Sequence, residues 1–299
     1  MNGRTRSRER NASRRSSRTG LPLHAVESLA AARAWPSTRI ICKQADQMTR
    51  IYLPTTGPDD WRWLLASPGL HWQQGTSAKA LADAWEDAND WPEAVATALA
   101  GAEALSGLDL LVALPEHEVP LPGGSRPSQT DLFVVARRPH GALVVIAVEG
   151  KAEEPFGDHT VEEWRRLGGA GREKRLAYLL DVLGLRDDDA VAGIRYQLLH
   201  RTASAVIEAG RFGAEDAVML VHSFSATRSW FADFAAFAGL YGDQAQSDCV
   251  ARVADLDGVG LHLGWVSDSP LPLAAPATLG PRFQFLSRTS ARALAMRAS

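Results

Sequence analysis

Cysteine is nearly absent from this chain of 299 residues, and so are long hydrophobic runs. The two cysteines, Cys42 and Cys249, are far apart in the sequence, which excludes a disulfide framework and a zinc site built from thiolates. No hydrophobic run approaches the roughly 18 residues that a membrane-spanning helix needs. We therefore expect a protein of the reducing cytoplasm that has no membrane segment.

Acidic residues outnumber basic residues outside the N-terminus. Residues 1–20 contain seven Arg and one Glu, a charge of +6, and because the whole chain carries −3, the remaining residues carry −9. Such an acidic body offers no broad basic surface that could hold nucleic acid regardless of its sequence. Contact with DNA or RNA would therefore need a local basic patch or a bound metal ion.

The N-terminal segment, residues 1–47, is rich in Arg and Ser and has no hydrophobic periodicity, which predicts a disordered head. Its composition also fits a transit peptide or a nucleic-acid-binding arm. Alternatively, Met1 is not the true start, because Met48 opens a strand-like segment followed by a turn. No linker or repeat follows, so residues 48–299 are expected to form a single domain.

The domain alternates helix-like and strand-like segments. Amphipathic patterns predict helices over residues 77–89, 92–105, 172–183, 192–209 and 229–240. Runs rich in β-branched residues predict extended segments over residues 109–121, 131–137, 142–149, 217–223 and 260–266. This order of elements predicts an α/β domain in which helices flank a mixed central sheet.

A tight turn joins two of the predicted strands. Residues 138–141 (RPHG) have proline at the second and glycine at the fourth position, the signature of a type I turn. In the simplest register of this hairpin, Asp131 lies opposite Val148. A turn one residue longer or shorter brings Asp131 opposite Glu149. In either register the two carboxylates lie on adjacent strands within about one residue of each other.

The second strand of the hairpin ends in Glu149-Gly150-Lys151. Because side chains alternate between the faces of a strand, Glu149 and Lys151 point the same way. Two nearby carboxylates repel each other, and a divalent cation such as Mg²⁺ or Mn²⁺ removes that repulsion. A lysine beside them could position an attacking water. The chain has only 4 Lys against 28 Arg, so a lysine here favours the use of a compact charge. A solvated strand end with a surface ion pair is the alternative.

These motifs resemble the PD-(D/E)XK superfamily, which has the restriction-endonuclease-like fold. The resemblance rests on Asp131, the following strand hairpin and residues 149–151. The literal Pro-Asp pair is absent, because Ser-Gln-Thr separates Pro127 from Asp131. The resemblance implies that Asp131 and Glu149 are metal ligands and that Lys151 is the catalytic lysine.

Superfamily members often carry a further acid on an upstream helix. Glu86 is the first candidate for this metal ligand and Glu93 the second, and either could equally be a solvated acid. Glu116 and Glu118 precede the hairpin and could approach the same end of the sheet. The alternative for these two acids is an exposed strand edge.

A second resemblance covers the stretch from about Gly75 to Tyr241. This stretch is similar to an uncharacterised bacterial family, a domain of unknown function. The segments that carry the similarity are PEHEVPLPGG, SQTDLFVVAR, VVIAVEGKAEEPFG, RYQLLHRTASAVIEA and AVMLVHSFS. The resemblance implies a fold and a site, and it implies no substrate.

A polar stripe runs along the predicted helix over residues 192–209. Its members follow the helical spacing i, i+3, i+4, i+7 and i+11: Gln197, His200, Arg201, Ser204 and Glu208. Gln197 and Arg201, with His200 between them, are candidates for binding a phosphate group of the substrate. A solvated helix face explains the same spacing.

The leading hypothesis is a Mg²⁺-dependent, nuclease-like phosphodiesterase that acts on DNA or RNA. The alternative is a non-catalytic binding or interaction protein that retains the nuclease-like sheet for structure. His222 and His262 are expected to be structural residues and not zinc ligands.

Overall fold

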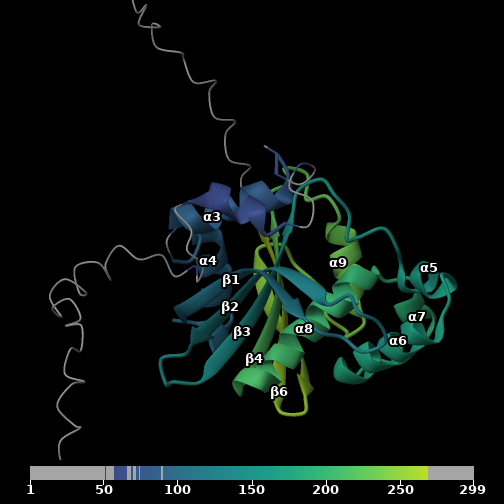
Figure 1. Ribbon diagram of the computed structural model, residues 1–299. Coiled ribbons are helices and arrows are strands. Elements are labelled where there is room, and N and C mark those ends of the chain that lie inside the picture. Colours follow the sequence, from purple (N-terminus) through teal and green to yellow (C-terminus); the bar gives the residue numbers. More distant parts are fainter. Residues whose placement is uncertain are drawn as a thin grey trace, which may run out of the picture. The chain divides into compact units, whose positions relative to one another are not determined.

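The computed structural model describes residues 51, 57–65, 69, 72–73, 75–88 and 90–268. The predicted head, residues 1–47, lies outside these residues. Within them, a six-stranded sheet carries helices on both faces (Figure 1). The expected α/β architecture with a mixed sheet is therefore confirmed.

The sheet combines an antiparallel meander with a parallel half. Its order is β1-β2-β3-β4-β6-β5. Strands β1 to β3 are antiparallel, β3, β4 and β6 run parallel, and β5 closes the far edge in the antiparallel sense. The strands are β1 (Asp109–Val119), β2 (Ser128–Arg137), β3 (Leu143–Lys151), β4 (Asp216–Ser223), β5 (Cys249–Leu256) and β6 (Val259–Ser267). The sequence patterns did not predict β5.

Each strongly periodic helix forms close to its expected position. The helices are η1 (Pro58–Trp63), α3 (Ser77–Ala88), α4 (Glu93–Gly101), η2 (Glu103–Leu105), α5 (Val161–Arg166), α6 (Ala170–Val182), α7 (Asp189–Ala192), α8 (Tyr196–Phe212) and α9 (Phe231–Gly239). The expected helix over 92–105 is divided into α4 and η2. In the part of the chain that the structure describes, no helix is long and apolar enough to cross a bilayer.

Two hydrophobic clusters fill the two faces of the sheet. On one face, helices α6, α8 and α9 pack against strand residues such as Phe133 and Ala147. On the other face, α3 and α4 pack against residues such as Ile146 and Val148. Because strand side chains alternate, residues 149 and 151 of β3 face α8. Gly150 faces α3, so a Cβ atom there would lie 3.4 Å from Leu81.

The hairpin between β2 and β3 has the longer of the registers considered from the sequence. The N–H of Gly141 donates to the carbonyl of Arg138 at 2.9 Å, and Gly141 has a φ of 99°, which glycine adopts without strain. Arg137 pairs with Leu143, and this register continues to the site end of the hairpin. Asp131 therefore lies level with Glu149 on the neighbouring strand.

Candidate functional site

The three residues singled out in the hairpin converge on the α8 face of the sheet. Nζ of Lys151 donates to Oε1 of Glu149 at 2.8 Å. Oδ2 of Asp131 accepts the backbone N–H of Gly150 at 2.9 Å, which ties the ends of the two strands together. Glu149 and Lys151 are only 2% and 3% exposed, whereas the Asp131 side chain is 22% exposed. Asp131 thus forms the solvent side of this group.

Helix α8 turns Gln197 and Arg201 of its polar stripe toward this group and not toward solvent. Nε2 of Gln197 donates to Oε1 of Glu149 at 2.7 Å, and Nε of Arg201 donates to Oε2 of Glu149 at 2.7 Å. Nη2 of Arg201 also lies 3.9 Å from Oδ1 of Asp131. The explanation of the stripe as a solvated helix face is therefore wrong.

Ser128 is hydrogen-bonded both to Arg201 and to His200. Oγ of Ser128 lies 2.8 Å from Nδ1 of His200 and accepts a hydrogen bond from Nη1 of Arg201 at 3.3 Å. Burial, followed by the neighbouring charge of Arg201, holds the pKa of His200 well below its ordinary value. A neutral His200 is consistent with a residue that orients Arg201. Ser128, which lies outside the extended segments expected from the sequence, opens strand β2.

Glu116, one of the two acids expected to approach this end of the sheet, is the third acid of the site. Its two neighbours in β1 pair with the two neighbours of Asp131 in β2, so the two acids lie level on adjacent strands. Glu116 has a φ of 55°, a left-handed conformation that is costly for a non-glycine residue. Burial, and next the charge of Asp131, raises the pKa of Glu116 to about 9.

The carboxylates of the site differ in how well they are neutralised. Burial opposes the ionisation of Glu149, but the cations of Arg201 and Lys151 outweigh it and lower the pKa of Glu149 to about 2. Burial and then the charge of Glu149 raise the pKa of Asp131 to about 7, despite Lys151 and Arg201. Glu149 is therefore fully paired, whereas the cations near Asp131 and Glu116 do not offset the burial and mutual repulsion of these two acids.

The other proposed acids do not join this group. Glu86 lies on α3, which packs on the opposite face of the sheet, and its Oε1 accepts a hydrogen bond from Nε1 of Trp61 at 2.8 Å. Within the described residues, no contact links Glu86 to the carboxylates of the hairpin. Glu93 and Glu118 are exposed. The upstream acid that interacts electrostatically with Asp131 and Glu149 is thus Glu116 on β1, and not a residue of a helix.

The metal hypothesis can be tested against the oxygen atoms present. Among the described residues there is no group of three or more His, Cys, Asp or Glu side chains arranged to hold a metal ion. One or two carboxylates with waters are sufficient for Mg²⁺, and Asp131 with Glu116 fits that requirement. Oε1 of Gln197 is buried and has no hydrogen-bond partner in the described part of the chain. Glu149, expected to be a ligand, already accepts hydrogen bonds from three side chains.

The two histidines expected to be structural lie in other parts of the sheet. Nδ1 of His222 accepts a hydrogen bond from Nε1 of Trp85 at 3.2 Å. Nε2 of His262 lies 2.8 Å from Oδ1 of Asp216. Both rings are buried, and neither belongs to the group around Glu149.

Comparison with known proteins identifies a family without an assigned activity. A family model described as a domain of unknown function (DUF6946) matches residues 54–270, well over half of the chain. No curated protein and no solved structure matches the chain significantly. Any function must therefore be argued from the site itself.

Proposed function

The chain belongs to the DUF6946 family, and we propose that it is a metal-dependent phosphodiesterase that acts on nucleic acid. The observation that carries this proposal is that two acids level on adjacent strands, Asp131 and Glu116, lie beside two cations, Lys151 and Arg201, on one face of the sheet. Phosphoryl-transfer sites combine acidic side chains that hold a metal cation with basic side chains that contact the phosphate anion.

The proposal includes a restriction-endonuclease-like core. Three features support that assignment: the antiparallel hairpin of β2 and β3, the level position of Asp131 and Glu149, and the crossover through α8 to the parallel strand β4. In this core the expected metal ligands change partly. Asp131 keeps its role, Glu116 becomes its partner, and Glu149 orients Lys151 and Arg201.

Asp131 and Glu116 would hold a Mg²⁺ or Mn²⁺ ion, which would supply Lewis acidity and lower the pKa of a bound water. Arg201 has an Nη2 group whose carboxylate contact is long, 3.9 Å to Asp131, so this group can donate to a phosphate oxygen. Oε1 of Gln197, which lacks a hydrogen-bond partner among described residues, can accept a hydrogen bond from an attacking water. Lys151 stabilises the negative charge that develops on the phosphoryl group.

A second candidate is a non-catalytic interaction protein that keeps this cluster for structure. The observation that favours it is the saturation of Glu149: both of its oxygens accept charged or amide hydrogen bonds, and the side chain is 3% exposed. The acidic net charge of the body points the same way. Under this alternative, removing Lys151 affects stability alone.

Cleavage assays with the full chain separate the two candidates. Single- and double-stranded DNA and RNA are incubated with the protein and Mg²⁺ or Mn²⁺, beside the variants Lys151→Met and Lys174→Met. Lys174 is an exposed lysine on α6 and serves as the matched control. The phosphodiesterase proposal expects cleavage by the parent and by Lys174→Met, and at least about a hundredfold loss in a folded Lys151→Met. A parent that cleaves none of these substrates and binds neither cation in calorimetry contradicts it.

A further inference from the structure

Two segments beside the proposed phosphodiesterase site are basic, although the body of the chain carries −9. One is the loop that joins β1 to β2, together with the first residue of β2 (residues 120–128). The other runs from α5 into the first half of α6 (residues 164–175). Together they contain five Arg, one Lys and one Glu, a charge of +5. A local basic surface of this kind is what an acidic protein needs in order to hold nucleic acid.

Backbone contact between two glycines brings the two segments together. A Cβ atom on Gly123 would collide with the backbone of Gly171, and a Cβ atom on Gly171 would collide with the backbone of Gly123. Arg175 strengthens this contact. Its Nε donates to the carbonyl of Pro122 at 2.9 Å, and its Nη2 donates to the carbonyl of Arg126 at 2.9 Å. The two segments therefore form one surface, although they are far apart in the sequence.

Some cations of this surface are neutralised or point elsewhere. Arg165 is paired with Glu173 at 3.3 Å, and Arg166 is paired with Glu162. Lys174 is exposed and lies roughly 200° around the axis of α6 from Arg172, so it points away from that arginine.

The arginine cluster, which we define as Arg126, Arg172 and Arg175, keeps an uncompensated charge. Within the described residues, none of the three forms an ion pair with a carboxylate. Arg126 is exposed. Arg172 and Arg175 donate to backbone carbonyls, which satisfy their N–H groups without cancelling their charge. The cluster can therefore still attract an anion.

The arginine cluster is continuous with the proposed site. Ser128, at the end of the first segment, accepts a hydrogen bond from Nη1 of Arg201 at 3.3 Å. In the second segment, the guanidinium of Arg172 lies 5.7 Å from the ring centre of Trp164. Trp164 in turn stacks on Tyr196 of α8 with ring centroids 4.0 Å apart. Both segments thus contact the end of α8 that carries the site residues.

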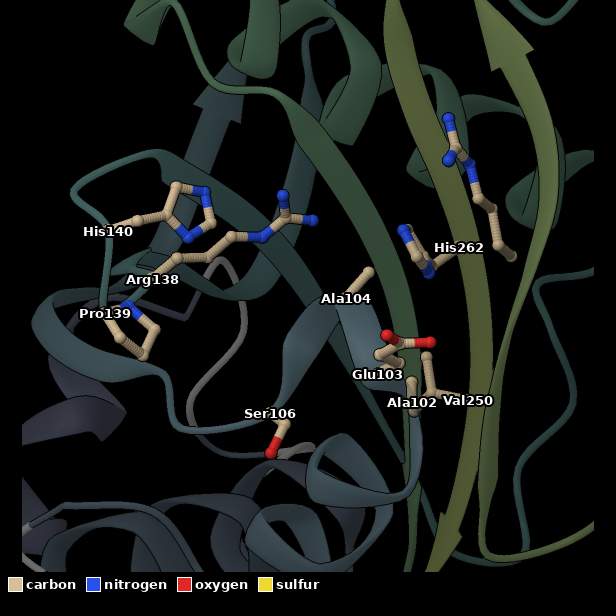
Figure 2. Close-up of a pocket in the computed structure, with 10 residues that line it drawn as sticks. Ala102, Glu103, Ala104, Ser106, Arg138, Pro139, His140, Val250 and His262 are labelled. Atoms are coloured by element: carbon tan, nitrogen blue, oxygen red, sulfur yellow. The ribbon is translucent and has the colours of Figure 1, made fainter.

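The other end of the β2–β3 hairpin provides a contrast. A cavity of about 680 Å³ lies where the hairpin turn meets strands β5 and β6 (Figure 2). Two arginines line it, and both are paired with carboxylates. Arg138 contacts Glu215 and Asp216, and Arg252 contacts Asp255 at 3.0 Å. These cations are therefore less available to an anion than those of the arginine cluster.

We propose that the arginine cluster binds the phosphates of a nucleic acid strand and leads that strand to Asp131 and Arg201. The three arginines come from two segments and not from one point, which suits a polymer with repeated phosphates. Contacts to phosphate position a strand and carry no sequence information, so the binding has no sequence preference. This inference rests on the proposed function, because it names the surface that presents the substrate to that site.

Fluorescence polarisation in EDTA measures binding by the full chain without cleavage, with labelled single- and double-stranded DNA and single-stranded RNA as probes. Arg126→Gln/Arg172→Gln removes two charges of the cluster. Lys174→Gln/Arg252→Gln removes two exposed charges elsewhere and is the matched control. We expect the cluster variant to bind at least about fivefold more weakly. Its slope of log affinity against log salt should be smaller by about 1.4–1.8. The control should keep the affinity and slope of the parent.

Cross-linking locates the contact, because residues 1–20 carry +6 and are the same in all three proteins. Oligonucleotides that contain iodouracil are irradiated with the full chain, and the cross-linked peptides are identified by mass spectrometry. We expect cross-links within residues 120–128 or 164–175. Cross-links confined to residues 1–20 would overturn the inference, as would equal affinities of the folded cluster variant and the control. Thermal melting checks the folding of both.

Two further results would also overturn the inference. One is an absence of binding to every probe by the parent. The other is an affinity for polyglutamate equal to that for an oligonucleotide of the same charge, which would identify an acidic protein as the partner.

Failure of the proposed function gives a different result. Binding that depends on the cluster, without cleavage in Mg²⁺ or Mn²⁺, contradicts the phosphodiesterase and supports the cluster as a binding surface. Cleavage by the cluster variant with the KM of the parent contradicts the role of the cluster and supports the phosphodiesterase.

Discussion

Nε of Arg201 lies 2.7 Å from Oε2 of Glu149, which joins helix α8 to the end of strand β3 across 52 residues of sequence. The two side chains are 11% and 3% exposed. A buried ion pair adds little net stability relative to an apolar pair, but breaking it leaves an uncompensated charge in the interior. The ion pair therefore adds little to the free energy of unfolding, but the loss of either partner alone is expected to lower it strongly.

The first prediction concerns this pair. Arg201→Met leaves Glu149 buried with Lys151 as its remaining cation, and we expect a loss of about 3–5 kcal/mol in the free energy of unfolding. Adding Glu149→Gln removes the stranded carboxylate and restores part of that loss, because Lys151 then keeps its hydrogen bond to the carbonyl of Gly150 but loses its salt bridge. Urea denaturation of the two single variants and the double variant measures the coupling.

The surface ion pair of Arg165 and Asp187 provides the control for this cycle. Their side chains are 34% and 52% exposed, so Arg165→Met is expected to cost less than about 1 kcal/mol. Additive effects of Arg201→Met and Glu149→Gln would show that the two side chains are not energetically coupled.

A second prediction follows from the raised pKa values of Asp131 and Glu116. An acid whose pKa is raised by folding makes its full contribution to protein stability below the unfolded pKa, near 4. That contribution is lost as pH rises from there through the folded pKa. These values are about 7 for Asp131 and about 9 for Glu116. In metal-free buffer we expect the melting temperature to fall between pH 6 and pH 9, by about 2–4 °C for each kcal/mol lost.

Two comparisons make this pH dependence specific. Glu116→Gln removes one of the two ionisations, so its melting temperature should change less over the same range. The lowered pKa of Glu149, about 2, gives stability that is lost only as pH falls below about 4, outside the range measured. A pH dependence identical in parent and Glu116→Gln would show that Glu116 ionises without cost in the folded protein.

The local patterns of the sequence were sufficient to predict the hairpin and the acids and lysine that it brings together. The turn over residues 138–141 and the alternation within β3 are short-range properties, so the position of Asp131 beside Glu149 followed from strand geometry. The stripe on α8 was equally visible as spacing. Its direction was not, because a spacing of polar residues does not distinguish a face that meets solvent from one that meets buried carboxylates.

The features that the sequence did not reveal depend on tertiary contacts or on unusual backbone. Glu116 was one of two acids beside His117, and nothing local marks its left-handed φ of 55°. Strand β5 is an edge strand in which only Val250 is buried, so its hydrophobic alternation is weak. Helix α5 is different: Thr160 and Glu163 form a capping box, a signal that was present in the sequence.

The third prediction decides which acids hold the cation. Burial and mutual repulsion oppose the ionisation of Asp131 and Glu116, and a bound cation would offset both effects, so Asp131→Asn and Glu116→Gln should each weaken Mn²⁺ binding at least about tenfold. Glu86→Gln, which changes an acid hydrogen-bonded to Trp61, should leave binding unchanged. Electron paramagnetic resonance of free Mn²⁺ measures all four proteins. Loss of binding in Glu86→Gln with retention in Glu116→Gln would restore the helical acid as the ligand.

The last prediction concerns the backbone of Glu116. A left-handed conformation costs a non-glycine residue about 1 kcal/mol or more, and here the residue is also an acid that burial keeps from ionising easily. Glu116→Gly relieves both penalties, so we expect the free energy of unfolding at pH 8 to rise by roughly 1 kcal/mol while cation binding is lost. Glu118→Gly, two residues along the same strand, lacks a positive φ to relieve. It should lose about 0.5–1 kcal/mol and retain the cation. Equal destabilisation by both glycine variants would mean that the conformation of Glu116 carries no strain.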